Sequence, residues 1–184
     1  MIKVSQKIES IDSTLSEIPR FGMKFSVPGS FNNVSWFGRG PYESYWDRKS
    51  SAAINYYSGP IWEQSFQYVR PQETGNKTDV YWMAISNDKN GLIAIGLPQF
   101  DGSVHHYPYS DLDYYPGTRR HGKIDYRKRI KWIGLLIISK WVLVAITAGG
   151  QNLMKNIHYI QKTMNFLLCS HLTLVQMILR NFQN

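Results

Sequence analysis

The chain has 184 residues, enough for one domain of ordinary size with its own core. Its formal net charge of +8 at first suggests an anionic partner such as nucleic acid, but all thirteen acidic and thirteen of the twenty-one basic residues lie at or before Asp125. Residues 1–125 therefore carry no net charge, and the last 59 residues hold eight Lys or Arg and no acid. This distribution argues against a nucleic-acid-binding protein.

The cysteine content and the first residues of the chain predict the cellular compartment of the protein. The chain has one cysteine, Cys169, so an intramolecular disulfide is excluded and an oxidising compartment is not required. The N-terminal run "MIKVSQKIES" lacks the apolar segment of a secretory signal. We therefore expect a cytoplasmic location.

Short strands separated by turns are predicted along the first hundred residues. Residues 2–27 alternate between apolar and polar side chains on either side of the turn region "SEIPRFG", and residues 33–49 begin as a strand and enter a Gly/Pro loop at Gly38. Residues 66–86 contain a strand, a turn and a second strand, and "GLIAIGL" (91–97) is a short apolar strand after the turn "NDKNG". The pattern predicts an antiparallel all-β sandwich or barrel, without a helix longer than a turn or two before residue 130.

The segment Trp132–Ala148, "WIGLLIISKWVLVAITA", does not match the polar, turn-rich residues before it. It has the apolarity of a membrane span, but it is short for one, has Lys140 at its centre and is rich in β-branched residues. Membrane span, buried helix and a segment foreign to the fold are the alternatives. Residues 151–184 are loosely amphipathic and compatible with helix.

The run "FGRGPYESYWDRK" (37–49) is the most distinctive. Gly38 and Gly40 form a lone G-x-G, which is weak evidence for phosphate binding because no helix follows. A structural function is favoured, in which the glycines and Pro41 set a sharp turn. The turn would be stabilised by cross-paired charges (Arg39, Glu43, Asp47 and Arg48) and by packed rings (Tyr42, Tyr45 and Trp46).

Two further segments carry polar residues. In residues 68–82, Arg70 and Glu73 flank a turn at Pro71, and Asn76 begins a glycosylation sequon that we interpret as a chance match, because nothing indicates secretion. Residues 105–115 contain two His and two Asp, but adjacent His side chains on a strand point to opposite faces, so a loop or surface function is favoured over a metal site.

No catalytic residue is assigned from the sequence. A glycosidase needs two carboxyl groups about 5 to 10 Å apart across the scissile bond. The pairs Glu43 with Asp47 and Glu63 with Glu73 lie in turn-rich segments and are not distinguished from surface charges.

Three runs, "IPRFGMKF" (18–25), "WFGRGPYESYWDRKSSA" (36–52) and "YVRPQETGNKTDVYWMAI" (68–85), together resemble the C-terminal small-chain domain of family 2 β-galactosidases. Their order and spacing match the family motifs, with Tyr81 standing where the family prefers Arg. The resemblance implies a galactose-mutarotase-like β-sandwich over residues 1–131. The structural motif residues that it marks are Arg39, Gly40, Pro41, Glu43, Tyr45, Asp47, Arg48, Arg70, Pro71, Glu73 and Asn76.

By the same resemblance, the intact enzyme hydrolyses terminal β-galactosides such as lactose with retention. Its acid/base and nucleophile glutamates lie in a barrel domain upstream, which this chain does not contain, and it commonly uses Mg and Na ions. We therefore expect a fragment without catalytic activity, cofactor or metal site, whose partners are the remainder of the polypeptide and, in the intact enzyme, the galactoside. The alternatives are a stand-alone carbohydrate-binding module, with no sugar-binding residue assigned, and a membrane-anchored β-domain.

The family's substrate-facing Trp motif, near G-x-G-G-D-x-S-W-G, is absent from the residues as written, but a shifted reading frame restores it. Trp141 followed by Val142 forces a shifted Gly codon, and Met154 followed by Lys155 forces a shifted Glu codon. With permitted third bases, the shifted frame contains GGDNSWG. We therefore predict a frame slip between Ile130 and Leu136, an incomplete sandwich over 1–131, and an out-of-frame tail over 132–184 that is apolar and helix-prone or disordered.

Overall fold

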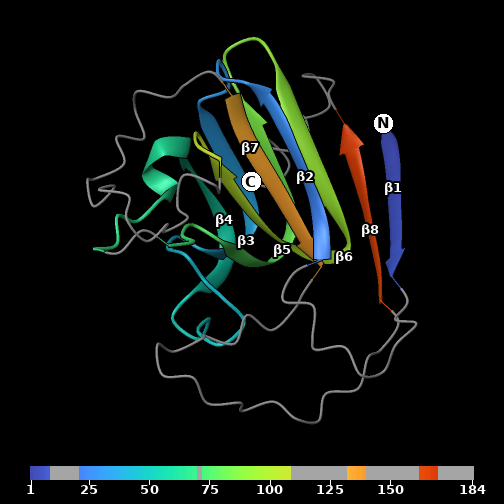
Figure 1. Ribbon diagram of the computed structural model, residues 1–184, viewed down its shortest axis with the longest axis horizontal. Helices are drawn as coiled ribbons and strands as arrows, with labels where there is room; N and C mark the ends of the chain where they lie inside the picture. Colours follow the sequence, from blue (N-terminus) through green and yellow to red (C-terminus); the bar gives the residue numbers. More distant parts are fainter. Residues whose placement is uncertain (9–20, 70–71, 109–131, 140–161, 170–184) are drawn as a thin grey trace, which may run out of the picture.

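The computed structural model describes residues 1–8, 21–69 and 72–108, together with the backbone of two later strands (Figure 1). Except for one short 3-10 helix, η1 (Ile61–Gln64), every regular element is a β-strand. The strands are β1 (Ile2–Ile8), β2 (Phe21–Pro28), β3 (Asn33–Gly40), β4 (Ala53–Pro60), β5 (Lys77–Ser86), β6 (Gly91–His105), β7 (Trp132–Ser139) and β8 (Lys162–Cys169). The predicted all-β class is confirmed.

All strand pairs are antiparallel. The order β1-β8-β6-β5-β3-β4 forms the main path, and β7 pairs with both β2 and β6. Figure 1 shows β2 and β7 lying over β3 and β5, so the strands form two layers. The predicted turn "NDKNG" joins β5 to β6, where Asn87 Oδ1 accepts hydrogen bonds from the amides of Lys89 (2.9 Å) and Asn90 (2.6 Å).

Strand β6 is longer than the short strand predicted over residues 91–97. It continues to His105, because its two halves pair with different strands on the side away from β5. Residues 93–96 pair with β8, and residues 101–105 pair with β7. The register with β5 shifts twice around Val80, as expected where an irregularity bends a strand from one layer into the other.

The core lies between the two layers. The alternation predicted for β2 is confirmed, because Phe21, Met23, Phe25 and Val27 are half-buried and pack against this core. Its fully buried members come mainly from β3, β5 and β6 and include Trp36, Met83, Ile85 and Phe100. A second apolar cluster of Trp82, Ala84 and Ile93 lies on the other face of the β3–β5–β6 sheet.

The described parts of residues 132–184 are strands, which corrects the helical expectation in those ranges. Residues 132–139 pair with β2 from Phe21↔Ser139 to Pro28↔Trp132, and residues 162–169 pair with β1. An apolar run rich in isoleucine suits a strand held between two others. Within the described residues, no helix is long and apolar enough to cross a membrane. Residues 140–161 and 170–184 lie outside the described part.

Candidate functional site

The loop over residues 41–52 and the segment over residues 74–79 lie against each other. The amide of Ser44 donates to the carbonyl oxygen of Asn76 at 2.8 Å, and the side-chain amide of Asn76 donates to the carbonyl oxygen of Ser44 at 2.9 Å. The amide of Thr78 donates to Ser44 Oγ at 3.0 Å. The two distinctive runs of the sequence therefore form one site.

Glu43 joins three segments of the chain through its carboxylate. It accepts hydrogen bonds from Thr74 Oγ1 and from the amide of Gly75, both at 2.8 Å, and from the hydroxyl of Tyr68. Arg48 forms an ion pair with it at 3.4 Å. Burial, and then the hydrogen bond to Glu43, raise the pKa of Tyr68 above its usual range. These donors occupy the carboxylate oxygens of Glu43.

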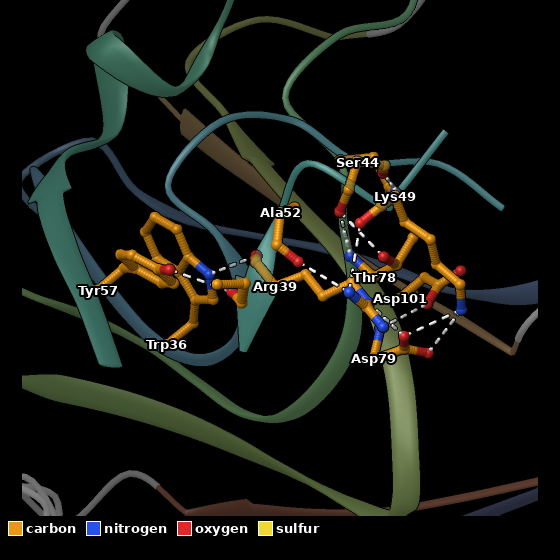
Figure 2. Close-up of polar contacts among 11 residues, drawn as sticks. Trp36, Arg39, Ser44, Lys49, Ala52, Tyr57, Thr78, Asp79 and Asp101 are labelled. Carbon is orange, nitrogen blue, oxygen red and sulfur yellow. Dashed lines mark hydrogen bonds and ion pairs between the residues drawn. The ribbon is translucent and has the colours of Figure 1, made fainter. Parts of the chain in front are cut away.

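Asp79 is the centre of an ion-pair network with Arg39 and Lys49 (Figure 2). Its Oδ2 lies 2.7 Å from Arg39 Nε and 2.9 Å from Lys49 Nζ. Arg39 also donates through Nη1 to the carbonyl oxygen of Ala52 at 2.7 Å, so the guanidinium holds the end of the loop as well. The φ of Asp79 is 53°, in the left-handed region that Asp and Asn tolerate better than most residues, and its amide donates to Asp101 Oδ1 at 3.2 Å.

Lys77 is a buried cation on the core side of the site, with 3% of its surface exposed. Its Nζ donates to the carbonyl oxygen of Pro41 at 2.9 Å and lies 4.8 Å from the ring centroid of Trp36. Burial lowers the pKa of Lys77 to about 8, and the charge of Glu43 opposes that shift. The amine is therefore held by a carbonyl dipole and a ring face, in an environment that disfavours its charge.

Two glycines are required by the close approach of backbones. Gly75 has φ of +77°, and a Cβ there would overlap the carbonyl oxygen of Gln64. A Cβ at Gly40 would lie 2.7 Å from the Tyr57 ring. The glycines of the two motifs thus serve packing and turn geometry.

Most of the predicted motif residues that the structure describes meet in this site: Arg39, Gly40, Pro41, Glu43, Tyr45, Arg48 and Asn76. Of the four charges expected to cross-pair, Arg48 pairs with Glu43. Arg39 instead pairs with Asp79, because that carboxylate lies beside it on the neighbouring strand. Asp47 is exposed, and no described residue forms an ion pair with it. Glu73 is half-buried, and Arg70 and Pro71 lie outside the described residues.

Sequence reasoning missed Lys49, Lys77 and Asp79, which carry much of the network. The available signal was their position inside the two motifs, since Lys49 follows the D-R pair and Asp79 ends the run N-K-T-D. Asn76, the start of the sequon, is 4% exposed and its side-chain amide donates to the chain, so the folded protein cannot carry a glycan there.

In the segment that contains His105 and His106, side chains form hydrogen bonds with other parts of the fold. The Nδ1 atom of buried His105 lies 3.1 Å from Ser65 Oγ, and the hydroxyl of Tyr107 donates to the same oxygen at 3.2 Å. Burial lowers the pKa of His106. Within the described ranges, no group of three or more His, Cys, Asp or Glu side chains could hold a metal ion. Asp111 and Asp113 lie outside those ranges.

Comparison with known proteins decides the family. Residues 1–124 match the model of the β-galactosidase small chain. The chain belongs to the β-galactosidase small-chain family. The β-galactosidase of Priestia megaterium is 42% identical over 113 residues, which are 61% of this chain and 11% of that enzyme. The β-galactosidase of Vibrio cholerae is 35% identical over 101 residues, 55% of this chain and 9% of that enzyme. The chain thus spans about a tenth of the length of these relatives.

The ion-pair network can be tested by Asp79→Asn. Asparagine tolerates the same positive φ, so the substitution removes the charge while keeping the backbone conformation. Loss of the Asp79 carboxylate charge, which pairs with both Arg39 and Lys49, should lower the free energy of unfolding by about 2–3 kcal/mol. The decrease is smaller than that expected for breaking a fully buried ion pair, because both cations are partly exposed. Urea unfolding measures this. Asp88→Asn, at an exposed turn, is the control, and equal effects of the two variants would contradict the network's importance.

The buried Lys77 predicts a rise of stability with pH. The pKa of Lys77 is lowered from 10.5 to about 8 in the folded chain. Between pH 8 and pH 10.5 the Lys77 amine is therefore protonated in the unfolded chain and neutral in the folded chain. The free energy of unfolding should therefore rise by roughly 3 kcal/mol from below pH 8 to above pH 10.5. Lys77→Met should remove this rise, whereas Lys89→Met at an exposed turn should keep it. Equal pH slopes in urea unfolding for the protein and Lys77→Met would refute the assignment.

Proposed function

We propose that this chain is a non-catalytic fragment of a β-galactosidase, whose intact form hydrolyses terminal β-D-galactosides such as lactose with retention. The two carboxyl groups for that reaction would come from the barrel domain in the remainder of the polypeptide. Family membership and the small share of the relatives' length support this proposal. The partners are then the remainder of the polypeptide and, in the intact enzyme, the galactoside. Neither nucleic acid nor membrane is a partner, and the location is the cytoplasm.

The proposal rests mainly on the observation that the carboxylates of Glu43 and Asp79 are already bound by groups of the chain itself. A retaining glycosidase needs one carboxylate oxygen free to attack the sugar and one carboxyl group free to protonate the leaving group. The oxygens of Glu43 are occupied by donors from the chain itself, and Asp79 is neutralised by Arg39 and Lys49. These acids stabilise a loop and have no oxygen directed at a substrate.

The proposal includes the frame slip between Ile130 and Leu136. The match to the family model ends at residue 124, and the residues after Asp125 contain no acid. In the shifted frame the family's Trp motif returns, which would supply the aromatic contact with the sugar. The tail over 132–184 then replaces the part of the small-chain domain that contacts substrate.

A carbohydrate-binding module is the second candidate function, because several aromatic residues near the site are exposed. Tyr42 is 81% exposed, Trp46 45% and Trp62 43%. Such rings can stack on sugar faces, but Lys49 lies 5.0 Å from the ring centroid of Trp46 and competes for that ring. The fragment proposal therefore ranks first.

The purified chain should not hydrolyse a chromogenic β-galactoside. The protein is expressed in a host without β-galactosidase, and a full-length relative serves as the positive control. Turnover that co-purifies with the chain would contradict the proposal. A parallel lactose titration followed by tryptophan fluorescence separates the two candidates, since saturable millimolar binding without turnover would favour the binding module.

The nucleotide sequence across codons 130–136 should contain a single-base insertion or deletion relative to a frame that encodes the Trp motif. Sequencing of the genomic DNA and of the transcript measures this directly. If both show that no alternative frame encodes G-G-D-x-S-W-G, the frame slip is refuted, while the family assignment over residues 1–124 stands.

A further inference from the structure

Three strands lie at the edges of the described layers, and they differ in charge. β1, β2 and β4 each pair with one strand only among those described. Edge strands present unpaired N–H and C=O groups, and proteins protect them with Lys or Pro. β1 contains Lys3 and Lys7, and β2 contains Lys24. β4, "AINYYSGP", contains no charged residue, and its one proline, Pro60, is its last residue. It is the edge without lysine.

The free side of β4 is accessible and regular. The strand pairs with β3 through eight consecutive residues without a bulge, from Asn33↔Pro60 to Gly40↔Ala53. Ile54 is 43% exposed, and Asn55 and Ser58 are exposed. The amide of Tyr56 donates to Asn55 Oδ1 at 2.8 Å rather than to β3, so this amide points away from the sheet. The Asn55 side chain thus accepts a hydrogen bond that the carbonyl oxygen of an added strand could accept instead.

We propose that β4 pairs antiparallel with β4 of a second copy of this chain, about a two-fold axis. In such a pairing residues at equal distances on either side of the axis lie opposite each other, so a strand with lysines at its middle, or on both sides of it, would bring like charges together. β1 and β2 would bring lysines together, whereas β4 would not. Of the three described edges, β4 is therefore the one that can lie against a second copy of itself without opposing charged side chains.

The pairing also continues an existing apolar face. A two-fold axis at Tyr56 places Ile54 of one copy opposite Ser58 of the other, because both are two residues from the axis. Tyr56 already packs on Trp82, with ring centroids 5.9 Å apart. The cluster on that face would then run across both copies. Since the other two edges carry lysine, the assembly closes as a dimer.

Sedimentation equilibrium of the full chain over a range of concentrations tests the proposal. A reversible dimer is expected, and Ser58→Lys should weaken it by about tenfold or more, because each dimer then carries a lysine on both strands of the new ladder. Ser26→Lys is the matched control: the same change at an exposed serine of β2 should leave the dimer unchanged. Circular dichroism shows that both variants fold.

Amide hydrogen exchange gives a second measurement that requires no variant. The amides of Ile54, Tyr56 and Ser58 should exchange more slowly at concentrations where the dimer dominates, and those of β2 should not change with concentration. A monomer at all concentrations, a dimer weakened equally by both Lys variants, or assemblies that grow beyond two copies would overturn the proposal.

Discussion

The neutralisation of Asp79 by Arg39 and Lys49 is the interaction on which the rest of the site depends. Arg39 is the last residue but one of β3, Lys49 lies in the loop and Asp79 lies in β5, so one carboxylate fixes three segments. The guanidinium of Arg39 also binds the carbonyl oxygen of Ala52, immediately before β4 begins. An unpaired charge at this depth would cost several kcal/mol, so the loop and both strands are stable only together.

This dependence explains how the site can hold several charged groups inside the fold. Glu43 and Asp79 would each be costly to bury alone, and the chain supplies donors for both. Catalytic carboxylates differ, because they keep an oxygen available to substrate. The part aligned with the β-galactosidase of Priestia megaterium is 11% of that enzyme, and within it Glu43 and Asp79 stabilise the loop and the adjoining strands.

Much of the fold could be predicted from the sequence, because alternation and turn residues act locally. The alternation of β2 and the turn at Asn87 follow from neighbouring residues, and both were predicted. The ion-pair network could not be derived in the same way. Arg39 and Asp79 are 40 residues apart, and only strand pairing brings them within 2.7 Å. The nearer candidates Glu43 and Asp47 gave the wrong partner for Arg39. Composition likewise suggested a helix at Trp132, where the partner strands β2 and β6 favour a strand.

Strand β7 shows how a tail with an unusual composition can belong to the same sheet. The ladder between β7 and β2 is made by backbone groups, which are the same in every reading frame. Any apolar, β-branched run of about eight residues can occupy that position. Loops differ, because their structure depends on particular residues such as Glu43 and Gly75. The proposed change of frame after residue 131 would therefore preserve the sheet pairing of β7, whereas a loop that depends on particular side chains would be lost by such a change.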